Sequence, residues 1–483
     1  MLSERDEAIK KLYDLLEGRK IETARIWSKK SESNILINEA EATTSYSNVE
    51  RTIKNKPGRK AGVKLSESFI ASHVKKEIVT VPGPEVCPDC GNATMLVGID
   101  KSIKIEMTPA EVKIIEYQFE KRACYPCGNI YESEHVFPLG GYLTPSFLAA
   151  ILYNKYVLGV PLYRMEEHFK EMGINISRQA LANYVIDAAG ELEILYDKLK
   201  EKLINTNIKV LHADETTLEV LELLKKENRK NSYMWLYSTT FYENQIYIYD
   251  FENSRGHGYP DEFLRNYEGY LVVDGYDGYN NIDGVTLCGC WAHARRKFTD
   301  IIKGISEERK KTSLSYKFIK LIDKLFVLED KYMKECNSID EIKQRRNKES
   351  KPILDAYFAL IEEKVDKSDE KLRKAMKYSL DQKEKLSRFL EDGHIPLSNN
   401  LAERGIKPFV ICRKNFLFSN SIQGAKASAI IFSIIQTARA NGLNIFNYLQ
   451  RLFIKLPDSP ISEIDKFLPW NKEIFDEFGD FAD

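Results

Sequence analysis

The chain lacks an excess of charge of either sign and lacks an apolar run long enough to cross a membrane. Its 71 basic and 72 acidic residues leave a formal net charge of −1, so any binding of nucleic acid must rely on locally concentrated positive charge. The longest apolar stretch, around 427–435, is about half of a membrane span. Four charged residues at positions 4–7 exclude a secretory signal there. We therefore expect a cytoplasmic protein without membrane contact.

Cysteine is too sparse for a disulfide scaffold, with eight in 483 residues. In a reducing cytoplasm, closely paired cysteines indicate a metal site instead. The remaining composition, 43% hydrophobic and 30% charged, is typical of a globular protein. A single hydrophobic core rarely serves a chain of this length, so two to four domains are expected.

Two short cysteine motifs, CPDC and CYPC, predict a structural zinc site. Their ligands would be Cys87, Cys90, Cys124 and Cys127. Each CxxC can place two thiolates on one ion, and two such pairs complete a tetrahedral site. A redox dithiol would need only one pair. The sequence between the pairs alternates polar and apolar residues, so we expect a small β module around one Zn²⁺.

The segment before the cysteines predicts a helix followed by a basic linker. Leu2, Ile9, Leu12 and Leu16 have roughly heptad spacing, which fits either a short dimerising coiled coil or a plain amphipathic helix. Residues 51–64 hold six basic residues and no acidic one. They form either a solvated linker or one that also contacts phosphate. The candidate contacts in this linker are Lys56, Arg59 and Lys60.

Residues 145–190 are predicted to be helical and contain a candidate helix-turn-helix. A first helix ends near Gly173, and Ser177 is placed to cap a second. Three polar residues near the start of that second helix could face DNA: Arg178, Gln179 and Asn183. An ordinary helical hairpin has the same spacing and remains the alternative.

After residue 205 the pattern changes from helical to strand-like. The runs IKVLHADETTLEVL, SYMWLYSTTF and QIYIYDF predict an antiparallel meander, and a short helix precedes a fourth run, YLVVDGYDGY. VTLCGCWAHARRKF then predicts a strand leading into a helix. Residues 300–392 are charged and helical, as expected of an insertion. Between positions 404 and 457 there are eight basic residues and no acidic one, which predicts a basic face.

Three carboxylates far apart in the sequence are candidates for a metal-dependent phosphoryl-transfer site. Asp214 and Asp274 each follow an apolar strand, and Glu403 lies in a predicted helix begun by Ser398 or an adjacent asparagine. Oxygen ligands of this kind can hold two Mg²⁺ about 3.5–4 Å apart. The alternatives are ordinary turn-capping aspartates and a capping box formed by Asn400 and Glu403.

Other groups near these acids could compete for the same role. The competing carboxylates are Glu215, Asp277 and Asp283. Cys288 and Cys290 are most simply interpreted as buried thiols, although a CxC beside His293 could also bind metal.

Several strings resemble the TnpC-type transposases of bacterial insertion sequences. The most specific are HADET, DGYDGYN, CWAHARRKF, NNLAERGIKPFVICRKNFLFSNS, GAKASA and ARANGLN. KKSES, NEAEA, KPGRK, the CxxC pairs, VPLYRMEEHF and LPWN follow in the order of that family. The resemblance therefore covers almost the whole chain.

The resemblance implies a multidomain α/β protein with an RNase H-like catalytic domain interrupted by a helical insertion. A four-cysteine zinc-binding β module and a helical helix-turn-helix-like domain would precede it. We expect an N-terminal helix (1–35), a basic linker (36–80), a zinc-binding domain (81–138), a helical DNA-binding domain (139–204), a first part of the core (205–299), a helical insertion (300–392), a second part of the core (393–445) and a tail (446–483).

By the same resemblance, the DDE triad falls on Asp214, Asp274 and Glu403, which would hold two Mg²⁺ or Mn²⁺ ions. The expected function is a transposase that binds terminal inverted repeats, cleaves at the element ends and joins the 3′-OH to target DNA. Candidate phosphate contacts follow Glu403 in the sequence: Arg404, Lys407, Arg413 and Lys414, with Asn415 a weaker candidate.

The expected partner is double-stranded DNA, on which the chain would act as a homo-oligomer associated with the nucleoid. Small accessory proteins of the same element are further candidate partners. Two alternatives stay open from the residues: a DNA-binding regulator derived from a transposase, and an RNase H-fold nuclease that cuts without joining. Intact acids at all three positions argue against the regulator.

Overall fold

The computed structural model describes residue 115 and residues 121–123, 130–132, 143–205, 208–241 and 243–478. The predicted N-terminal helix, the basic linker with its three candidate contacts, and the four CxxC cysteines lie outside the described residues. The chain divides into two compact units, one of which comprises 48–117. Apart from Ile115, the described residues belong to the other unit.

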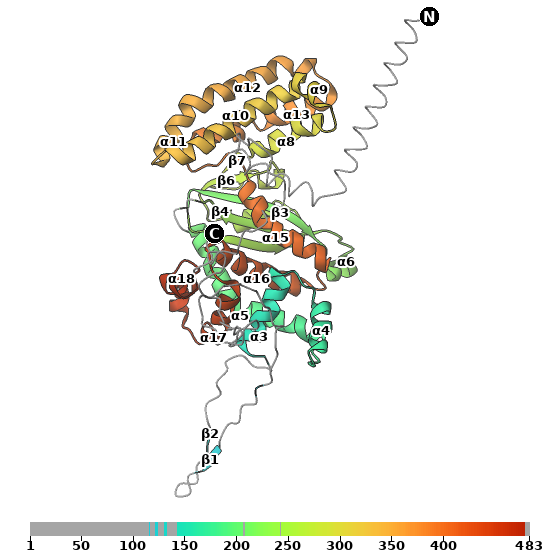
Figure 1. The fold of residues 1–483 in the computed structure, drawn as a ribbon, viewed down its shortest axis with the longest axis vertical. Coiled ribbons are helices and arrows are strands. Elements are labelled where there is room, and N and C mark those ends of the chain that lie inside the picture. Colours follow the sequence, from blue (N-terminus) through green and yellow to red (C-terminus); the bar gives the residue numbers. More distant parts are fainter. Residues whose placement is uncertain are drawn as a thin grey trace, which may run out of the picture. The chain divides into compact units, whose positions relative to one another are not determined.

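A five-stranded mixed sheet forms the centre of the described structure (Figure 1). Its order is β5 (Tyr247–Glu252), β4 (Ser232–Thr239), β3 (Val210–Leu218), β6 (Gly269–Val273) and β7 (Val285–Gly289). Strands β3, β4 and β5 pair antiparallel, which confirms the predicted meander. Strands β6 and β7 join β3 in parallel, and α7 (Gly258–Phe263) precedes β6 as expected.

Alternate residues of the parallel strands enter two different cores, because side chains of a strand alternate between the two faces of the sheet. Leu211, Leu271 and Leu287 belong to the larger core. Val210, Val272 and Cys288 belong to a second core. At β3, β6 and β7 the sheet therefore separates the two cores, whereas both faces of β4 and β5 contribute to the larger one.

Helices from both sides of the strand segment in the sequence build the larger core. They are α3 (Pro145–Leu152), α4 (Leu162–Glu171), α5 (Arg178–Asn205), α15 (Asn400–Phe416), α16 (Ile422–Ala440), α17 (Ile445–Lys455) and α18 (Lys472–Phe478). Helix α16 packs on β5 and α5, and α15 packs on β3 and β4. A short helix, α6 (Leu221–Glu227), follows β3.

The predicted helical character of residues 300–392 is confirmed, and these helices build the second core. They are α9 (Glu307–Thr312), α10 (Leu314–Glu335), α11 (Ile339–Arg345), α12 (Lys351–Lys364), α13 (Glu370–Asp381) and α14 (Lys383–Ser387). Helices α10 and α13 pack on α8 (Trp291–Ile302), which follows β7 directly, as expected. Trp291 is buried among Tyr357, Phe358 and Phe389.

Helices α4 and α5 have the predicted helix-turn-helix spacing. Gly173 has φ +86°, a conformation that glycine adopts without steric penalty. The Ser177 hydroxyl accepts the Ala180 amide at 3.2 Å, which confirms the predicted cap. Three exposed side chains follow on the first turns of α5: Arg178, Gln179 and Asn183.

A short antiparallel pair, β1 (Lys121–Ala123) and β2 (Ile130–Glu132), flanks the segment that contains the second CxxC.

Among the described helices, none combines the length and the apolar character that crossing a bilayer requires.

Candidate active site

The parallel register aligns Asp214 and Asp274 on neighbouring strands. His212 of β3 pairs with Val272 of β6, and Val272 pairs with Cys288 of β7. Two residues further along each chain come Asp214, Asp274 and Cys290. Because side chains two residues apart in a strand share a face, this row lies on the sheet face that also carries Val272 and Cys288 of the second core and Leu236, the partner of Asp214 on β4. Sequence reasoning placed Asp214 at the end of a strand, which is wrong: β3 continues to Leu218, and Asp214 pairs with Leu236 inside the sheet.

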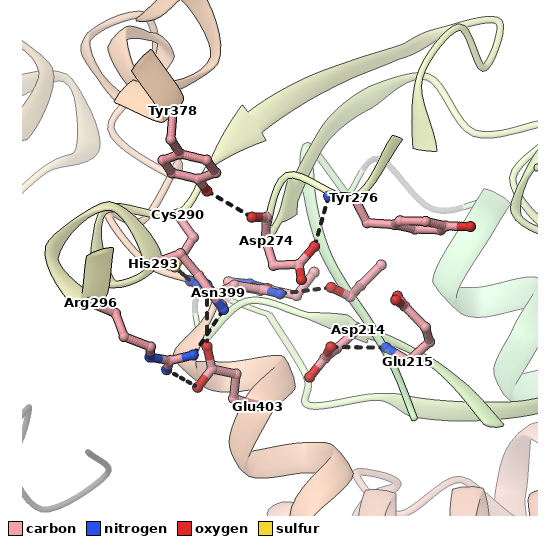
Figure 2. Close-up of polar contacts among 12 residues, drawn as sticks. Asp214, Glu215, Asp274, Tyr276, Cys290, His293, Arg296, Tyr378, Asn399 and Glu403 are labelled. Carbon is pink, nitrogen blue, oxygen red and sulfur yellow. Dashed lines mark hydrogen bonds and ion pairs between the residues drawn. The ribbon is translucent and has the colours of Figure 1, made fainter. Parts of the chain in front are cut away.

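Asp214 is half-buried and surrounded by other carboxylates (Figure 2). Burial raises its pKa well above the ordinary value of 3.8, and the negative charges of Glu215, Glu403 and Asp274 raise it further. One Asp214 oxygen accepts the Glu215 amide at 2.9 Å. A site whose acids repel one another in this way is suited to a cation.

Asp274 lies directly after β6, where a tight turn fixes it. Its Oδ1 accepts the Tyr276 amide at 2.9 Å, so the turn-capping alternative is correct for one oxygen and leaves the other for a ligand. Gly275 has φ +98°, and a Cβ there would meet the Tyr378 hydroxyl at 3.1 Å. That hydroxyl donates to the Asp274 carbonyl at 2.9 Å. Helix α13 of the insertion therefore holds the turn that carries Asp274.

Glu403 lies in the first turn of α15, and a buried asparagine at the helix start ties it to β3. The N-cap is Asn399, whose carbonyl accepts the Glu403 amide at 3.1 Å. The Asn399 side chain accepts from His212 Nδ1 at 2.8 Å and donates to the Ala213 carbonyl at 2.7 Å. The predicted capping box of Asn400 and Glu403 is wrong, because Asn400 already belongs to the helix.

The same asparagine also reaches α8. The backbone amide of Asn399 donates to Sγ of Cys290, the residue before α8, at 3.1 Å. Burial lowers the His212 pKa to about 4, so the ring is neutral at neutral pH and donates one hydrogen to Asn399. Asn399 thus connects the elements that carry Asp214, Glu403 and Cys290. Sequence reasoning missed this role, for which the adjacent pair of asparagines was the sole signal.

The start of α8 brings a thiol, an imidazole and a guanidinium to Glu403. Cys290, His293 and Glu403 place one ligand atom each within 4.8 Å of one another. His293 Nδ1 lies 3.6 Å from Glu403 Oε1, and Arg296 lies 3.5 Å from Glu403 Oε2 and 3.1 Å from His293 Nε2. Cys290 is buried, as predicted. The group of side chains with the spacing of metal ligands includes Glu403 as well as Cys290 and His293. Arg296 supplies a positive charge beside Glu403.

The three competing carboxylates do not lie in the row formed by Asp214, Asp274 and Cys290. Glu215 accepts Arg255 Nε at 2.7 Å and the Tyr279 hydroxyl at 2.7 Å. Asp277 and Asp283 are exposed, and the Asp277 carboxylate accepts a hydrogen bond from the Asn280 side-chain amide at 3.1 Å. Glu215 is therefore engaged in an internal ion pair, and the other two point to solvent.

The candidate phosphate contacts on α15 divide into two groups. Arg404 and Lys414 are exposed and Lys407 is half-buried. Arg413 instead donates to Thr216 Oγ1 at 2.8 Å and to the Thr217 carbonyl, so it fastens α15 to β3. These bonds use Nη1 and uncharged partners, and the predicted phosphate contact at Arg413 stays a prediction.

The predicted single basic face of residues 404–457 is also only partly present. Lys426 lies near Asp250 and lowers the raised pKa of that carboxyl. Arg451 lies 3.5 Å from Glu477. These two cations are locally compensated, which leaves the exposed stripe of α15 as the basic surface beside the carboxylates.

Comparison with known proteins identifies the family of the chain. The profile of the transposase IS66 family matches residues 140–427, more than half of the chain. The IS66 C-terminal element matches residues 433–470. The zinc-finger binding domain of transposase IS66 matches residues 84–128, which include all four CxxC cysteines and support a structural zinc.

Three proteins of Sinorhizobium fredii (strain NBRC 101917 / NGR234) are similar over most of their length. The uncharacterized protein y4qI is 30% identical over 472 residues, which cover 90% of this chain and 84% of that protein. The uncharacterized protein y4hP is 27% identical, covering 97% of this chain and 85% of its own. For y4jD the identity is 27%, over 83% and 81% of the two chains. The chain therefore belongs to the IS66 family of insertion-sequence transposases.

Proposed function

We propose that this chain is a DDE-type transposase that binds the terminal inverted repeats of its element, cleaves phosphodiester bonds at the ends and joins the 3′-OH to target DNA. The observation that carries the proposal is the parallel register of β3 and β6, which brings Asp214 close to Asp274, directly after β6, and near Glu403. The strand order, three antiparallel strands followed by two parallel ones, supports an RNase H-like core.

The donor set fits divalent magnesium or manganese. Three carboxylates offer only oxygen ligands, which Mg²⁺ prefers. Burial and the neighbouring carboxylates raise the pKa of Asp214, which favours a bound cation at this cluster. Asp214, Asp274 and Glu403 would hold two ions. When bound, such ions activate an attacking oxygen and stabilise a leaving oxygen in phosphoryl transfer.

The chain's own residues would hold and orient DNA around these carboxylates. Arg404 and Lys407 follow Glu403 by one and four positions on α15, so they are placed to bind phosphates next to the reacting one. Arg296 holds the Glu403 carboxylate and the Tyr378 hydroxyl fixes the Asp274 turn. The exposed start of α5, with Arg178, would read the terminal repeat.

A strand-transfer assay tests the proposal. Labelled duplexes ending at the boundaries of the chain's own DNA element would be incubated with the full chain, Mg²⁺ and a circular target. We expect nicking at the element end followed by joined products. Cutting without joined products would favour the nuclease alternative, and repeat-specific binding without cutting would favour the regulator.

Zinc content gives a separate prediction about the CxxC pairs. Purified full-length protein should contain about one Zn²⁺ per chain, and Cys124→Ser should lose it. Cys288→Ser is the matched control, since Cys288 is packed in the second core and should leave the zinc content unchanged. Full zinc retention in Cys124→Ser would contradict the four-cysteine site. Loss of zinc in Cys290→Ser would instead place the ion beside His293.

Charge reversal on α15 tests the phosphate contacts. Lys407→Glu and Lys414→Glu should weaken binding to every duplex alike and reduce the slope of log K against log salt by about one per lost contact. Lys455→Glu, an exposed lysine on α17, is the control. A loss confined to one DNA sequence would show that these lysines read bases instead.

A further inference from the structure

The turn after α15 holds two exposed apolar side chains on a strained backbone. Leu417 is 66% exposed and Phe418 is 40% exposed. Leu417 has φ 66° and ψ −46°, and the Phe418 amide donates to the Phe416 carbonyl at 2.9 Å. This is the γ-turn with positive φ, which is rare and strained for a residue with a side chain. Strain of this kind concentrates at functional sites.

Bonds on both sides of the turn fix it to the end of β3. Arg413 donates to Thr216 Oγ1 at 2.8 Å before the turn. After it, the Ser419 amide donates to the Glu219 carbonyl and the Leu221 amide donates to the Ser419 carbonyl, each at 2.9 Å. Leu417 and Phe418 therefore project from a rigid base. Figure 1 shows α15 running along the sheet toward α6, where this turn lies.

The basic side chains along α15 favour a polyanion as the partner of this turn, although Glu219 and Glu222 lie on its far side, against residues 419–422. Arg404, Lys407 and Lys414 occupy one stripe of α15, since positions three, seven and ten apart share a helix face. No acidic residue occurs in the sequence from 404 to 457. A DNA duplex suits both features of this surface, because it offers phosphates to the basic stripe and an apolar base stack to Leu417 and Phe418.

We propose that Leu417 and Phe418 form an apolar wedge that enters between base pairs of the duplex bound along α15. This inference rests on the proposed function, which places DNA at Glu403. Glu403 and Leu417 are fourteen positions apart, which is about 21 Å along a helix, or about six base pairs of duplex. Wedges of Leu and Phe are known to unstack base steps and kink the DNA.

Fluorescence of 2-aminopurine tests the wedge. The full chain would be bound, without divalent metal, to duplexes of its own element ends that carry 2-aminopurine at successive positions. We expect a several-fold rise in fluorescence about six base pairs from the cleaved end, and no rise at distant positions. The rise should disappear in the Leu417→Ser, Phe418→Ser double variant. Ile461→Ser, which removes another exposed apolar residue (78% exposed), should keep it.

A second variant separates the side chain from the fold. Leu417→Gly suits the positive φ, so it should melt no lower than wild type and still lose most of the signal. A flat signal in bound wild-type protein would overturn the wedge, and normal cleavage in the same preparation would leave the proposed function standing. The double variant could instead change its oligomeric state and keep the fluorescence rise. That result would assign Leu417 and Phe418 to contacts between chains and would overturn the wedge as well.

Discussion

Replacing Asp214 by asparagine is expected to lower DNA cleavage and strand transfer by at least about 10³-fold, without unfolding the chain. Burial and the neighbouring carboxylates both raise the pKa of Asp214, so its negative charge is unfavourable without a cation beside it. A neutral amide would hold a divalent ion poorly beside Asp274 and Glu403. Because the helix-turn-helix and the basic stripe of α15 are separate from Asp214, affinity for DNA should change little.

The same substitution should make the metal-free protein more stable. The folded-state pKa of Asp214 is raised, so the folded chain binds this proton more tightly than the unfolded chain does. The free energy of unfolding therefore falls as pH rises above 3.8 through the folded pKa. Asp214→Asn removes this penalty and should melt higher than wild type at neutral pH. Added Mg²⁺ should raise the melting temperature of wild type and not of the variant.

Matched controls make the test specific. Asp274→Asn and Glu403→Gln should be as inactive as Asp214→Asn, and combinations should add little, because the three acids would act as one unit. Asp277→Asn and Asp283→Asn change exposed carboxylates and should keep most of the activity. Glu215→Gln is unsuitable as a control, since Glu215 pairs with Arg255 inside the fold. Near wild-type cleavage by all three triad variants would exclude the DDE assignment.

The sequence pattern was sufficient for much of the local structure. Alternation of polar and apolar residues identified the antiparallel strands β3, β4 and β5, and Ser177 marked the start of α5. These features depend on neighbours in the chain, which a local pattern records. The helical character of the insertion was visible for the same reason.

The contacts that assemble the candidate site could not be read from local patterns. The alignment of Asp214 with Asp274 depends on the parallel register of β3 and β6, whose paired residues, such as Val210 and Tyr270, are sixty positions apart. The bond from Arg413 to Thr216, which joins α15 to β3, likewise links residues far apart in the sequence. Asn399 and Asn400 are identical in type, and only the tertiary fold shows which one is buried.

The insertion contributes to the site as well as to the second core. Tyr378 of α13 donates to the Asp274 carbonyl, and Trp291 at the start of α8 donates to the Leu386 carbonyl at 2.9 Å. The helix that supplies His293 and Arg296 is thereby packed against the insertion. Substitutions in this core are expected to affect the carboxylates through α8 and the Asp274 turn.

Replacing Asn399 by alanine is expected to lower both stability and metal affinity. The change leaves His212 Nδ1 and the Ala213 carbonyl without their buried partner, at a cost of about 3 kcal/mol in the free energy of unfolding. It also loosens β3 relative to the start of α15, and hence Asp214 relative to Glu403. Because Asn399 positions the carboxylates without touching substrate, the Mg²⁺ concentration for half-maximal cleavage should rise by about 10–100-fold.

Asn441→Ala is the control that separates positioning from simple stability. The Asn441 side chain also donates to two carbonyls, those of Gln245 and Thr437, at 2.7 and 2.8 Å, but it lies at the end of α16, away from the carboxylates. The Asn441→Ala substitution should lower the melting temperature and leave the Mg²⁺ concentration for half-maximal cleavage unchanged. Saturating Mg²⁺ should restore much of the activity of Asn399→Ala, measured below the melting temperature of both variants. If Asn399→Ala keeps the wild-type Mg²⁺ midpoint while losing stability, Asn399 supports the fold alone and does not set the geometry of the carboxylates.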